Sequence, residues 1–193
     1  MRNLLSLGAT VALALVAGGI VTAETPGTPM SRTAMTASVD ARLRVPDVDY
    51  RRHWVQLGSY SVLADEPTKG AKELHVVYAH PASVDAYRKT GTFPDGTILV
   101  KDVFVAKTED LTTGTASYAN VLVGRFVMVK DTGNKHAANS PLWGDGWGWA
   151  FYEGDEMRKT VTTDYQVDCL GCHEPARDTD LIYSQGYPVL KSR

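Results

Sequence analysis

Two cysteines and a histidine lie close together near the C-terminal end of the sequence, in the run Cys169-Leu170-Gly171-Cys172-His173. The spacing Cys-x-x-Cys-His is the attachment signature of c-type haem, in which two thiols add across the vinyl groups and the adjacent imidazole reaches the iron. A zinc site would need more ligands, but the chain has only these two cysteines, and a redox dithiol would leave His173 without a role. The sequence therefore predicts one covalent haem c, bound through Cys169 and Cys172 and ligated to iron by His173.

The iron ligand opposite His173 decides between electron transfer and chemistry on a small molecule. Met128 and Met157 could bind iron, but Met128 lies in a strand-like apolar run, where methionine is usually a core filler. Met157 lies in a polar stretch. Four further histidines are scattered along the chain: His53, His75, His80 and His136. A scattered histidine is more often a surface or hydrogen-bonded residue, so we expect an open or water-filled iron position.

The N-terminal residues have the features of a secretory signal. A short positive start precedes an apolar run from Leu4 to Val21, and Val21-Thr22-Ala23 offers a small-residue cleavage site. The apolar run is short and no charged stop-transfer pattern follows it, although an uncleaved anchor is the alternative. We therefore expect residues 1–23 to be removed, leaving a periplasmic chain without stable membrane insertion.

Composition limits what the mature chain can be. Removing residues 1–23 also removes Arg2, which leaves 170 residues with 19 Lys and Arg against 22 Asp and Glu, a formal charge of −3. A net negative charge argues against nucleic acid as a partner. Residues 24–45 are rich in Thr, Ala, Pro and Ser without a sustained apolar period, so we expect a flexible leader. Residues 46–193 are long enough for one domain with its own core.

Five stretches rich in Val, Ile, Tyr, Phe and Trp have strand character and are separated by turn residues. They are Trp54–Leu63, Leu74–Tyr78, Thr97–Ala106, Tyr118–Val129 and Trp147–Tyr152. A helix is predicted between Pro81 and Gly91, because proline favours the first turn of a helix and glycine its end. Residues 131–146 read as a surface loop, and a helix with an extended tail is expected after His173. The predicted fold is α+β, mainly an antiparallel β-sheet with a few helices, with haem c attached near the C-terminus.

The sequence also resembles the cytochrome P-460 family, which includes the cytochromes c-prime of the beta type. The resemblance covers the chain from Trp54 to Leu190. Its recognisable parts are the run from Tyr87 through Phe93-Pro94-Asp95-Gly96-Thr97-Ile98-Leu99-Val100-Lys101, the strand Trp147-Gly148-Trp149-Ala150-Phe151, the motif Cys169 to Glu174, and Tyr187-Pro188-Val189-Leu190. It implies a homodimeric, sheet-dominated haem protein with five-coordinate iron. Ordinary electron-transfer cytochromes c are usually helical and carry the haem motif near their start, the reverse of this arrangement.

Lys101 matches the residue that is cross-linked to the porphyrin in members that oxidise hydroxylamine to nitrogen oxides. Beta-type cytochromes c-prime lack this link and bind nitric oxide. Side chains alternate along a strand, so two sets face opposite ways: Leu99, Lys101, Val103 and Val105 on one face, Val100, Asp102 and Phe104 on the other. Apolar neighbours would lower the pKa of the Lys101 amine and keep part of it neutral, which is the nucleophilic form.

Enzymes of this family also use a distal carboxylate that accepts protons from the bound substrate. Four acids could take this role: Asp155, Glu156, Asp164 and Asp168. We choose Asp164 as the second catalytic residue beside Lys101, and His75 could be a further polar group near the pocket, where relatives often carry arginine. The aromatic residues expected to wall the haem are Phe104, Trp147, Trp149 and Phe151, although aromatic strand residues are core by default.

Three functions remain open. The favoured one is a haem-dependent hydroxylamine oxidoreductase with a lysine-linked haem. The second is a nitric oxide binding cytochrome of the c-prime beta type, and the third is an electron carrier with a sulfur or nitrogen sixth ligand. The expected partners are a small nitrogenous ligand or substrate and a redox partner protein.

Overall fold

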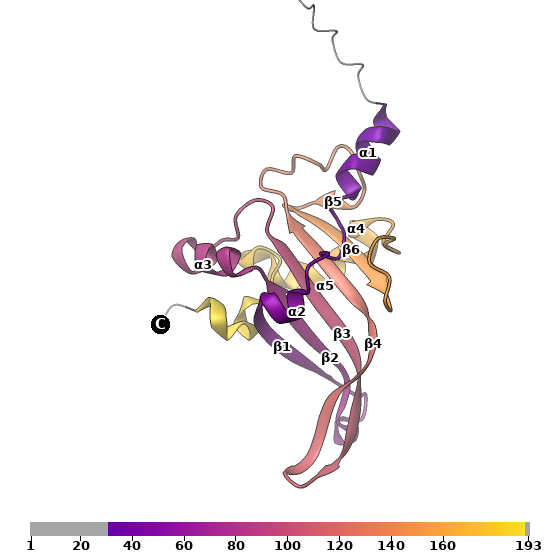
Figure 1. Ribbon diagram of the computed structural model, residues 1–193, viewed down its shortest axis with the longest axis vertical. Coiled ribbons are helices and arrows are strands. Elements are labelled where there is room, and N and C mark those ends of the chain that lie inside the picture. Colours follow the sequence, from indigo (N-terminus) through magenta and orange to yellow (C-terminus); the bar gives the residue numbers. More distant parts are fainter. Residues whose placement is uncertain (1–30, 192–193) are drawn as a thin grey trace, which may run out of the picture.

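The computed structural model describes residues 31–191, so the predicted signal, residues 1–23, lies outside the described part. One six-stranded antiparallel sheet forms its centre, with the strand order β1-β2-β3-β4-β6-β5 (Figure 1). The strands are β1 (Val55–Leu63), β2 (Ala71–Ala79), β3 (Ile98–Leu111), β4 (Gly114–Lys130), β5 (Trp143–Gly144) and β6 (Trp147–Glu153). The five predicted strands correspond to β1, β2, β3, β4 and β6. The predicted α+β class with a mainly antiparallel sheet is confirmed.

The helices among the described residues are short. The α-helices are α1 (Arg32–Asp40), α2 (Tyr50–His53), α3 (Pro81–Thr90), α4 (Tyr165–Asp168) and α5 (Leu170–His173). The 3₁₀ helices are η1 (Pro67–Lys69), η2 (Glu174–Thr179), η3 (Ser184–Gly186) and η4 (Pro188–Leu190). None of the helices within residues 31–191 combines the length and apolar character needed to cross a membrane.

Helix α3 begins and ends where the sequence predicts. The His80 side chain accepts a hydrogen bond from the main-chain N–H of Ala82, and Pro81 occupies the first turn, where a missing N–H costs nothing. Gly91 follows the last turn in the left-handed conformation, with φ of 78°, which glycine adopts without steric cost. The helix therefore has a defined start and stop.

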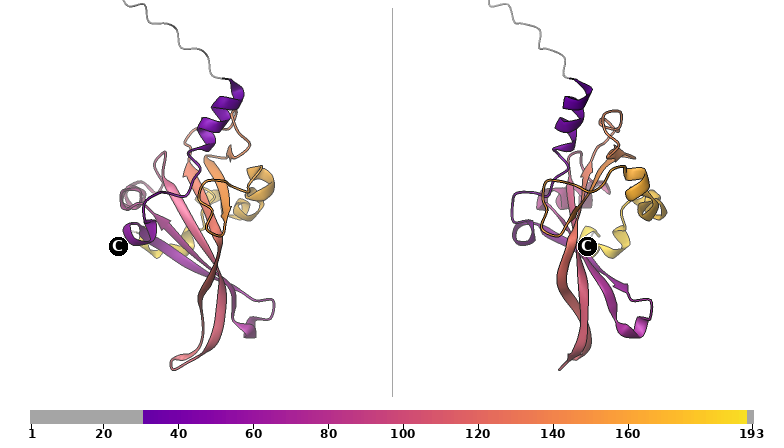
Figure 2. Two further views of the ribbon diagram at one scale, coloured as in Figure 1. Left: turned by 45° about the vertical axis from the view of Figure 1, so that its right-hand side comes forward. Right: turned by 90° about the vertical axis from the view of Figure 1, so that its right-hand side faces the viewer.

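A separate hydrophobic core lies on each face of the sheet. Figure 2 shows the C-terminal segment on one side of the sheet and the segment that carries α2 on the other. The C-terminal side buries residues such as Leu57, Val77, Leu99, Trp149 and Leu181. The other side buries residues such as Leu43, Val100, Val127, Trp143 and Tyr152. Because both faces are covered, neighbouring residues along β3 or β4 point towards opposite cores.

The predicted flexible leader, residues 24–45, needs correction where the structure describes it. Residues Arg32–Asp40 form α1, and Leu43 and Val45 are buried in the core beside α2. The main-chain N–H of Val45 also donates to the carbonyl of Met157. The folded part therefore begins before the predicted boundary at residue 46, because two apolar side chains next to that boundary are needed to cover the sheet.

The segment after His173 also differs from the prediction. A helix with an extended tail was expected, whereas the chain forms the short helices η2, η3 and η4 in succession. Asp180 and Leu181 interrupt it with positive φ values of 61° each, which ends any continuous helix. The resulting turns return Leu181, Tyr187 and Leu190 to the sheet as core residues.

Candidate functional site

A cavity of about 790 Å³ lies between the sheet and the C-terminal segment. Its floor carries side chains from β1, β2, β3, β4 and β6, and its roof comes from α4, α5 and the turns that follow. Most of its lining is apolar, including Val62, Val103, Phe126 and Phe151. This size and character are typical of pockets for cofactors and small molecules, which span roughly 300–1,000 Å³.

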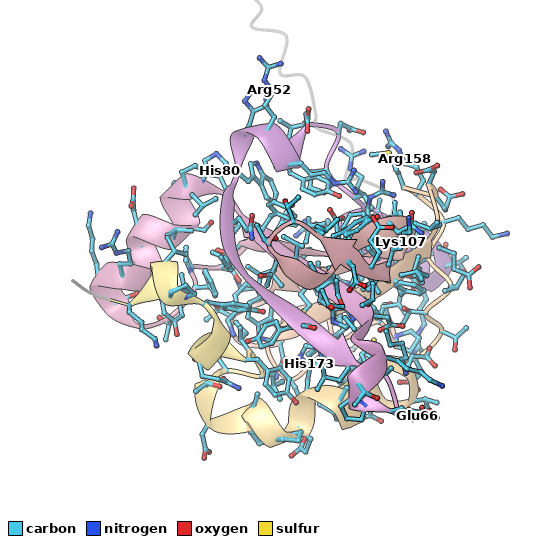
Figure 3. All side chains as sticks on the ribbon, turned by 90° about the horizontal axis from the view of Figure 1, so that it is seen from below. Arg52, Glu66, His80, Lys107, Arg158 and His173 are labelled. Atoms are coloured by element: carbon cyan, nitrogen blue, oxygen red, sulfur yellow. The ribbon has the colours of Figure 1, made fainter. Side chains whose placement is uncertain are left out.

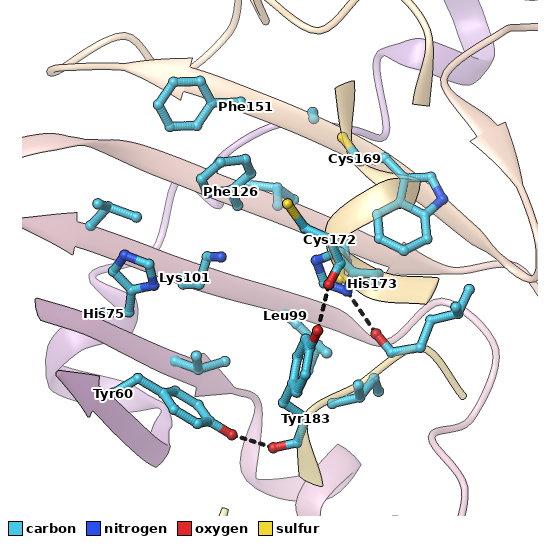
Figure 4. Close-up of a pocket in the computed structure, with 18 of the residues that line it drawn as sticks. Tyr60, His75, Leu99, Lys101, Phe126, Phe151, Cys169, Cys172, His173 and Tyr183 are labelled. Carbon is cyan, nitrogen blue, oxygen red and sulfur yellow. Dashed lines mark hydrogen bonds between the residues drawn. The ribbon is translucent and has the colours of Figure 1, made fainter. Parts of the chain in front are cut away.

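The Cys-x-x-Cys-His motif lies at one side of this cavity (Figure 4). Cys169, which joins α4 to α5, and Cys172 and His173 of α5 all line the cavity, and both cysteines are free thiols in the described structure. Cys169 is buried and Cys172 is exposed. Burial raises the pKa of the Cys169 thiol to about 11. Figure 3 shows His173 with the C-terminal helices, on the opposite side of the sheet from Arg52 of α2.

The His173 ring has a fixed orientation and tautomer. Its Nδ1 atom donates a hydrogen bond to the carbonyl oxygen of Leu181, 2.7 Å away, which leaves the Nε2 lone pair free. The Trp149 ring packs against the imidazole edge-on, with centroids 4.9 Å apart. Burial lowers the pKa of His173 and so favours the neutral ring that a metal requires. The positive φ of Leu181 places the accepting carbonyl.

Lys101 enters the cavity from the middle of β3, as the strand alternation predicts. It shares this lining with Leu99 and Val103, and its Nζ atom lies 4.4 Å from the centroid of the Phe126 ring. Burial lowers the pKa of the amine. A lysine with a lowered pKa holds more of its neutral, nucleophilic form.

A carboxylate and an imidazole that the strand β2 carries also line the cavity. Glu73 and His75 lie two residues apart and so share one face, and His75 Nε2 is 3.0 Å from Glu73 Oε2. His75 was predicted to be a polar group near the pocket, and it lines the cavity. Glu73 was not predicted, although its spacing from His75 on a predicted strand was the available signal.

The four aromatic residues that were predicted to lie beside the haem separate into two groups. Trp149 and Phe151 line the cavity, and the Phe151 ring centroid lies 4.3 Å from that of Phe126. Trp147 does not, because Phe93 covers its ring and its indole N–H donates to the carbonyl of Asp180. Phe104 lies on the opposite face of the sheet, where the Arg51 guanidinium stands 5.7 Å from its ring centroid.

Of the predicted distal acids, Asp164 does not line the cavity. It is the N-cap of α4, and its carboxylate accepts from the main-chain N–H of Gln166 at 2.9 Å. Asp168 lines the cavity, but its Oδ2 atom already accepts main-chain hydrogen bonds from Thr163 and Asp164. Both carboxylates therefore accept main-chain hydrogen bonds at the start of α4, just before the Cys-x-x-Cys-His motif.

The other two candidate acids, Glu156 and Asp155, lie outside the cavity lining. Glu156 accepts main-chain hydrogen bonds from the three residues that follow it. The Asp155 side chain is fully exposed and lies 3.6 Å from the guanidinium of Arg125. Neither acid is among the residues that line the cavity.

The opposite face of the sheet carries a buried charged cluster directly behind Lys101. Asp102 is completely buried and accepts hydrogen bonds from the Tyr50 hydroxyl at 2.7 Å and from Arg51 Nε at 2.6 Å. Arg125 Nε donates to the same Tyr50 hydroxyl at 3.0 Å. These hydrogen bonds link α2 to the middle of β3 and β4.

The comparison with known families settles which family this arrangement represents. A sequence model for the family described as cytochrome P460 matches residues 48–184, which include the whole sheet and the Cys-x-x-Cys-His motif. The chain belongs to the cytochrome P-460 family. No curated protein matches the chain. Membership implies haem and iron as the cofactor and links the cytochrome P-460 chain to haem-dependent oxidation.

The residues of this cytochrome P-460 cavity fit a haem group. Two free thiols and an imidazole with an unused Nε2 atom meet at its edge, which is the donor set of the c-type attachment. Apolar side chains supply the rest of the lining, as a porphyrin requires. Cys169, Cys172 and His173 would hold the group, and Trp149 would support His173.

The candidates for a sixth iron ligand also separate by position. Met128 and His75 line the cavity. Met157 packs against the core on the opposite face of the sheet. The remaining histidines, His53, His80 and His136, are not among the lining residues.

Proposed function

We propose that this chain is a periplasmic mono-haem c oxidoreductase that oxidises hydroxylamine to nitrogen oxides. Haem would be attached through Cys169 and Cys172 and ligated through His173, with the opposite iron position open. The observation that carries this proposal is that Lys101 lies in the same apolar cavity as the haem motif. A buried amine with a lowered pKa is suited to attack on an oxidised porphyrin edge.

The protein side chains have distinct tasks in this proposal. Haem iron supplies a Lewis acid that polarises the substrate nitrogen and an electron acceptor when it is bound. His173, oriented by its hydrogen bond to the carbonyl of Leu181, would ligate the iron. Phe126 and Phe151 give the cavity an apolar wall, and the polar side chains in its lining include Lys101 and the Glu73–His75 pair.

Nitric oxide binding is the second candidate function, and the apolar lining favours it. Phe126 and Phe151 pack against each other in the cavity, and nitric oxide needs no proton acceptor. An electron carrier is the third, and it would need Met128 or His75 as the sixth ligand, since both line the cavity. The first two functions require an open iron position, whereas the third requires a filled one.

Hydroxylamine consumption with an artificial electron acceptor tests the proposed function. We expect wild-type holoprotein to turn over hydroxylamine, and ferrous protein to bind carbon monoxide rapidly. A protein that binds nitric oxide but consumes no hydroxylamine would favour the second function. A six-coordinate low-spin ferrous spectrum that Met128→Leu or His75→Gln converts to five-coordinate would establish the electron carrier.

The homodimer is also a proposal. The hairpin of β3 and β4 projects from the body of the molecule (Figure 1), and it exposes the paired residues Val105 and Val121 at 43% and 59%. Exposed apolar pairs on a projecting hairpin support an interface with a second copy. Analytical ultracentrifugation should show a dimer in wild type and a monomer in Val121→Lys.

A further inference from the structure

The Glu73–His75 pair is a further polar unit of the cavity. β2 directs both side chains to the cavity lining, and the Nε2–Oε2 distance of 3.0 Å is a hydrogen bond. Within residues 31–191, this is the one hydrogen bond that the His75 ring makes. The Nδ1 atom of His75 is thus left for a ligand.

The hydrogen bond decides which nitrogen of His75 carries the proton. A carboxylate accepts only, so Nε2 must donate, and Nδ1 keeps its lone pair. The same carboxylate stabilises the ring once Nδ1 is protonated, as in other carboxylate–imidazole pairs. Burial and the positive charge of Lys101 on the neighbouring strand β3 lower the pKa of His75, while Glu73 raises it. A neutral, oriented imidazole is a general base.

We propose that His75 is the proton acceptor for small protic ligands that bind in this cavity, with Glu73 as its positioning residue. This assignment rests on the proposed haem site and names the base for the proposed reaction. The ligand, a small neutral weak acid, loses one proton to Nδ1 of His75 and stays bound as its anion. The Nε2–H bond to Glu73 is kept throughout, and no electron moves in this step.

This assignment also explains the polar pattern of the cavity. Asp164 caps α4, and the Asp168 carboxylate is occupied by main-chain donors. Among the carboxylates that line the cavity, Glu73 is therefore the one that contacts an imidazole in the lining. The proposed role of Lys101 as the porphyrin link would use its nitrogen and leave His75 as the available base.

Cyanide binding to the ferric protein tests the proton transfer without hydroxylamine turnover. Hydrogen cyanide is the dominant form at neutral pH and must lose its proton to bind as the anion. We expect His75→Gln to slow cyanide association by about 100-fold, within the range typical for loss of a general base. Nitric oxide is not protic, so its binding to ferrous His75→Gln should stay within about twofold of wild type.

His53→Gln is the matched control, because His53 is exposed and lies outside the cavity. It should bind cyanide at the wild-type rate. Glu73→Leu leaves His75 in place but removes the acceptor for Nε2–H, and nitrogen NMR of the ferrous carbon monoxide complex should show a mixture of His75 tautomers in place of the Nε2–H form. This second variant tests the claim even if His75→Gln loses haem.

The outcomes separate this assignment from the reaction. Cyanide association in His75→Gln at the wild-type rate, or an unchanged tautomer in Glu73→Leu, would overturn the assignment. If His75→Gln slows cyanide binding but the wild-type protein consumes no hydroxylamine, the assignment is supported and the proposed reaction is overturned. Hydroxylamine turnover that survives His75→Gln at full rate would overturn the assignment while the reaction stands.

Discussion

Lys101 and Asp102 are adjacent in β3, and their side chains lie on opposite faces of the sheet. Lys101 lines the cavity that holds the haem motif, and Asp102 is fully buried beside Tyr50 and Arg51. The strand period of two residues produces this separation, and both faces of the sheet are covered. A substitution of Lys101 should therefore affect the chemistry of the cavity, whereas a substitution of Asp102 should affect the stability of the fold.

Lys101→Leu should abolish any covalent link between the strand and the haem. In the wild type we expect digestion to release one species that joins the Lys101 peptide to the Cys169 to His173 peptide, because burial lowers the pKa of the amine and favours its nucleophilic form. Mass spectrometry of the haem peptides detects that species. The variant should also lose the red-shifted absorption band, and its haem should still bind nitric oxide.

Lys107→Leu is the control for that experiment. Lys107 lies on the same strand but pairs with Glu109 at the surface, at 2.6 Å. It should leave the joined species and the absorption band unchanged. A wild type that yields only the Cys169 to His173 haem peptide would place nitric oxide binding ahead of hydroxylamine oxidation.

Asp102→Ala should destabilise the protein strongly. The change leaves the buried Arg125 and the adjacent Arg51 without their shared carboxylate, and breaking a buried ion pair costs about 3–5 kcal/mol. Denaturant unfolding measures the loss. Asp155→Ala removes a fully exposed carboxylate near the same Arg125, and its effect on the unfolding free energy should be far smaller than that of Asp102→Ala. Equal costs for the two variants would contradict the role given to Asp102.

Stability at alkaline pH should depend on Tyr50. Burial, aided by the hydrogen bond to Asp102, raises the pKa of Tyr50 from 10.0 to about 12. The folded state holds this proton more tightly than the unfolded state, so the stabilisation is complete below pH 10 and is lost as the pH rises towards 12. Unfolding free energies measured across this range should fall less steeply in Tyr50→Phe. Identical slopes in the two proteins would refute this account.

Asp164→Ala should affect folding more than turnover. The carboxylate caps α4 through the main-chain N–H of Gln166, and removal of such a cap costs about 0.5–2 kcal/mol. Thermal unfolding should show that loss, while hydroxylamine oxidation per folded holoprotein stays near the wild-type rate. A large fall in turnover at unchanged stability would restore Asp164 as a catalytic acid.

Strand periodicity was sufficient to predict how β3 contributes to the site. Alternation placed Lys101 with Leu99 and Val103 on one face and Asp102 on the other, and the structure agrees. The same alternation puts Phe104 on the face of Asp102, so its predicted place beside the haem conflicted with that of Lys101. The alternation of side chains therefore predicted which face of the sheet each of these β3 residues occupies.

Long-range packing explains the parts that local patterns could not supply. Trp147 and Trp149 share a face of β6, but only Trp149 reaches the cavity, because Phe93 covers Trp147. Asp164 could be read as an acid of the site, whereas a capping residue before a short helix has the same local sequence. Glu73 is polar in sequence and becomes a site residue only because β2 lies beside β3.

The most direct test of the central claim is whether haem remains covalently attached to the Cys169 to His173 peptide. The measurement uses Lys101→Leu, so that no lysine link can retain the group, and applies acid-acetone extraction followed by digestion and mass spectrometry. The account predicts a peptide that carries one haem through two thioethers, and at most one thioether in the further variant Cys172→Ala. Haem that is extracted completely, leaving an unmodified Cys169 to His173 peptide, would contradict it.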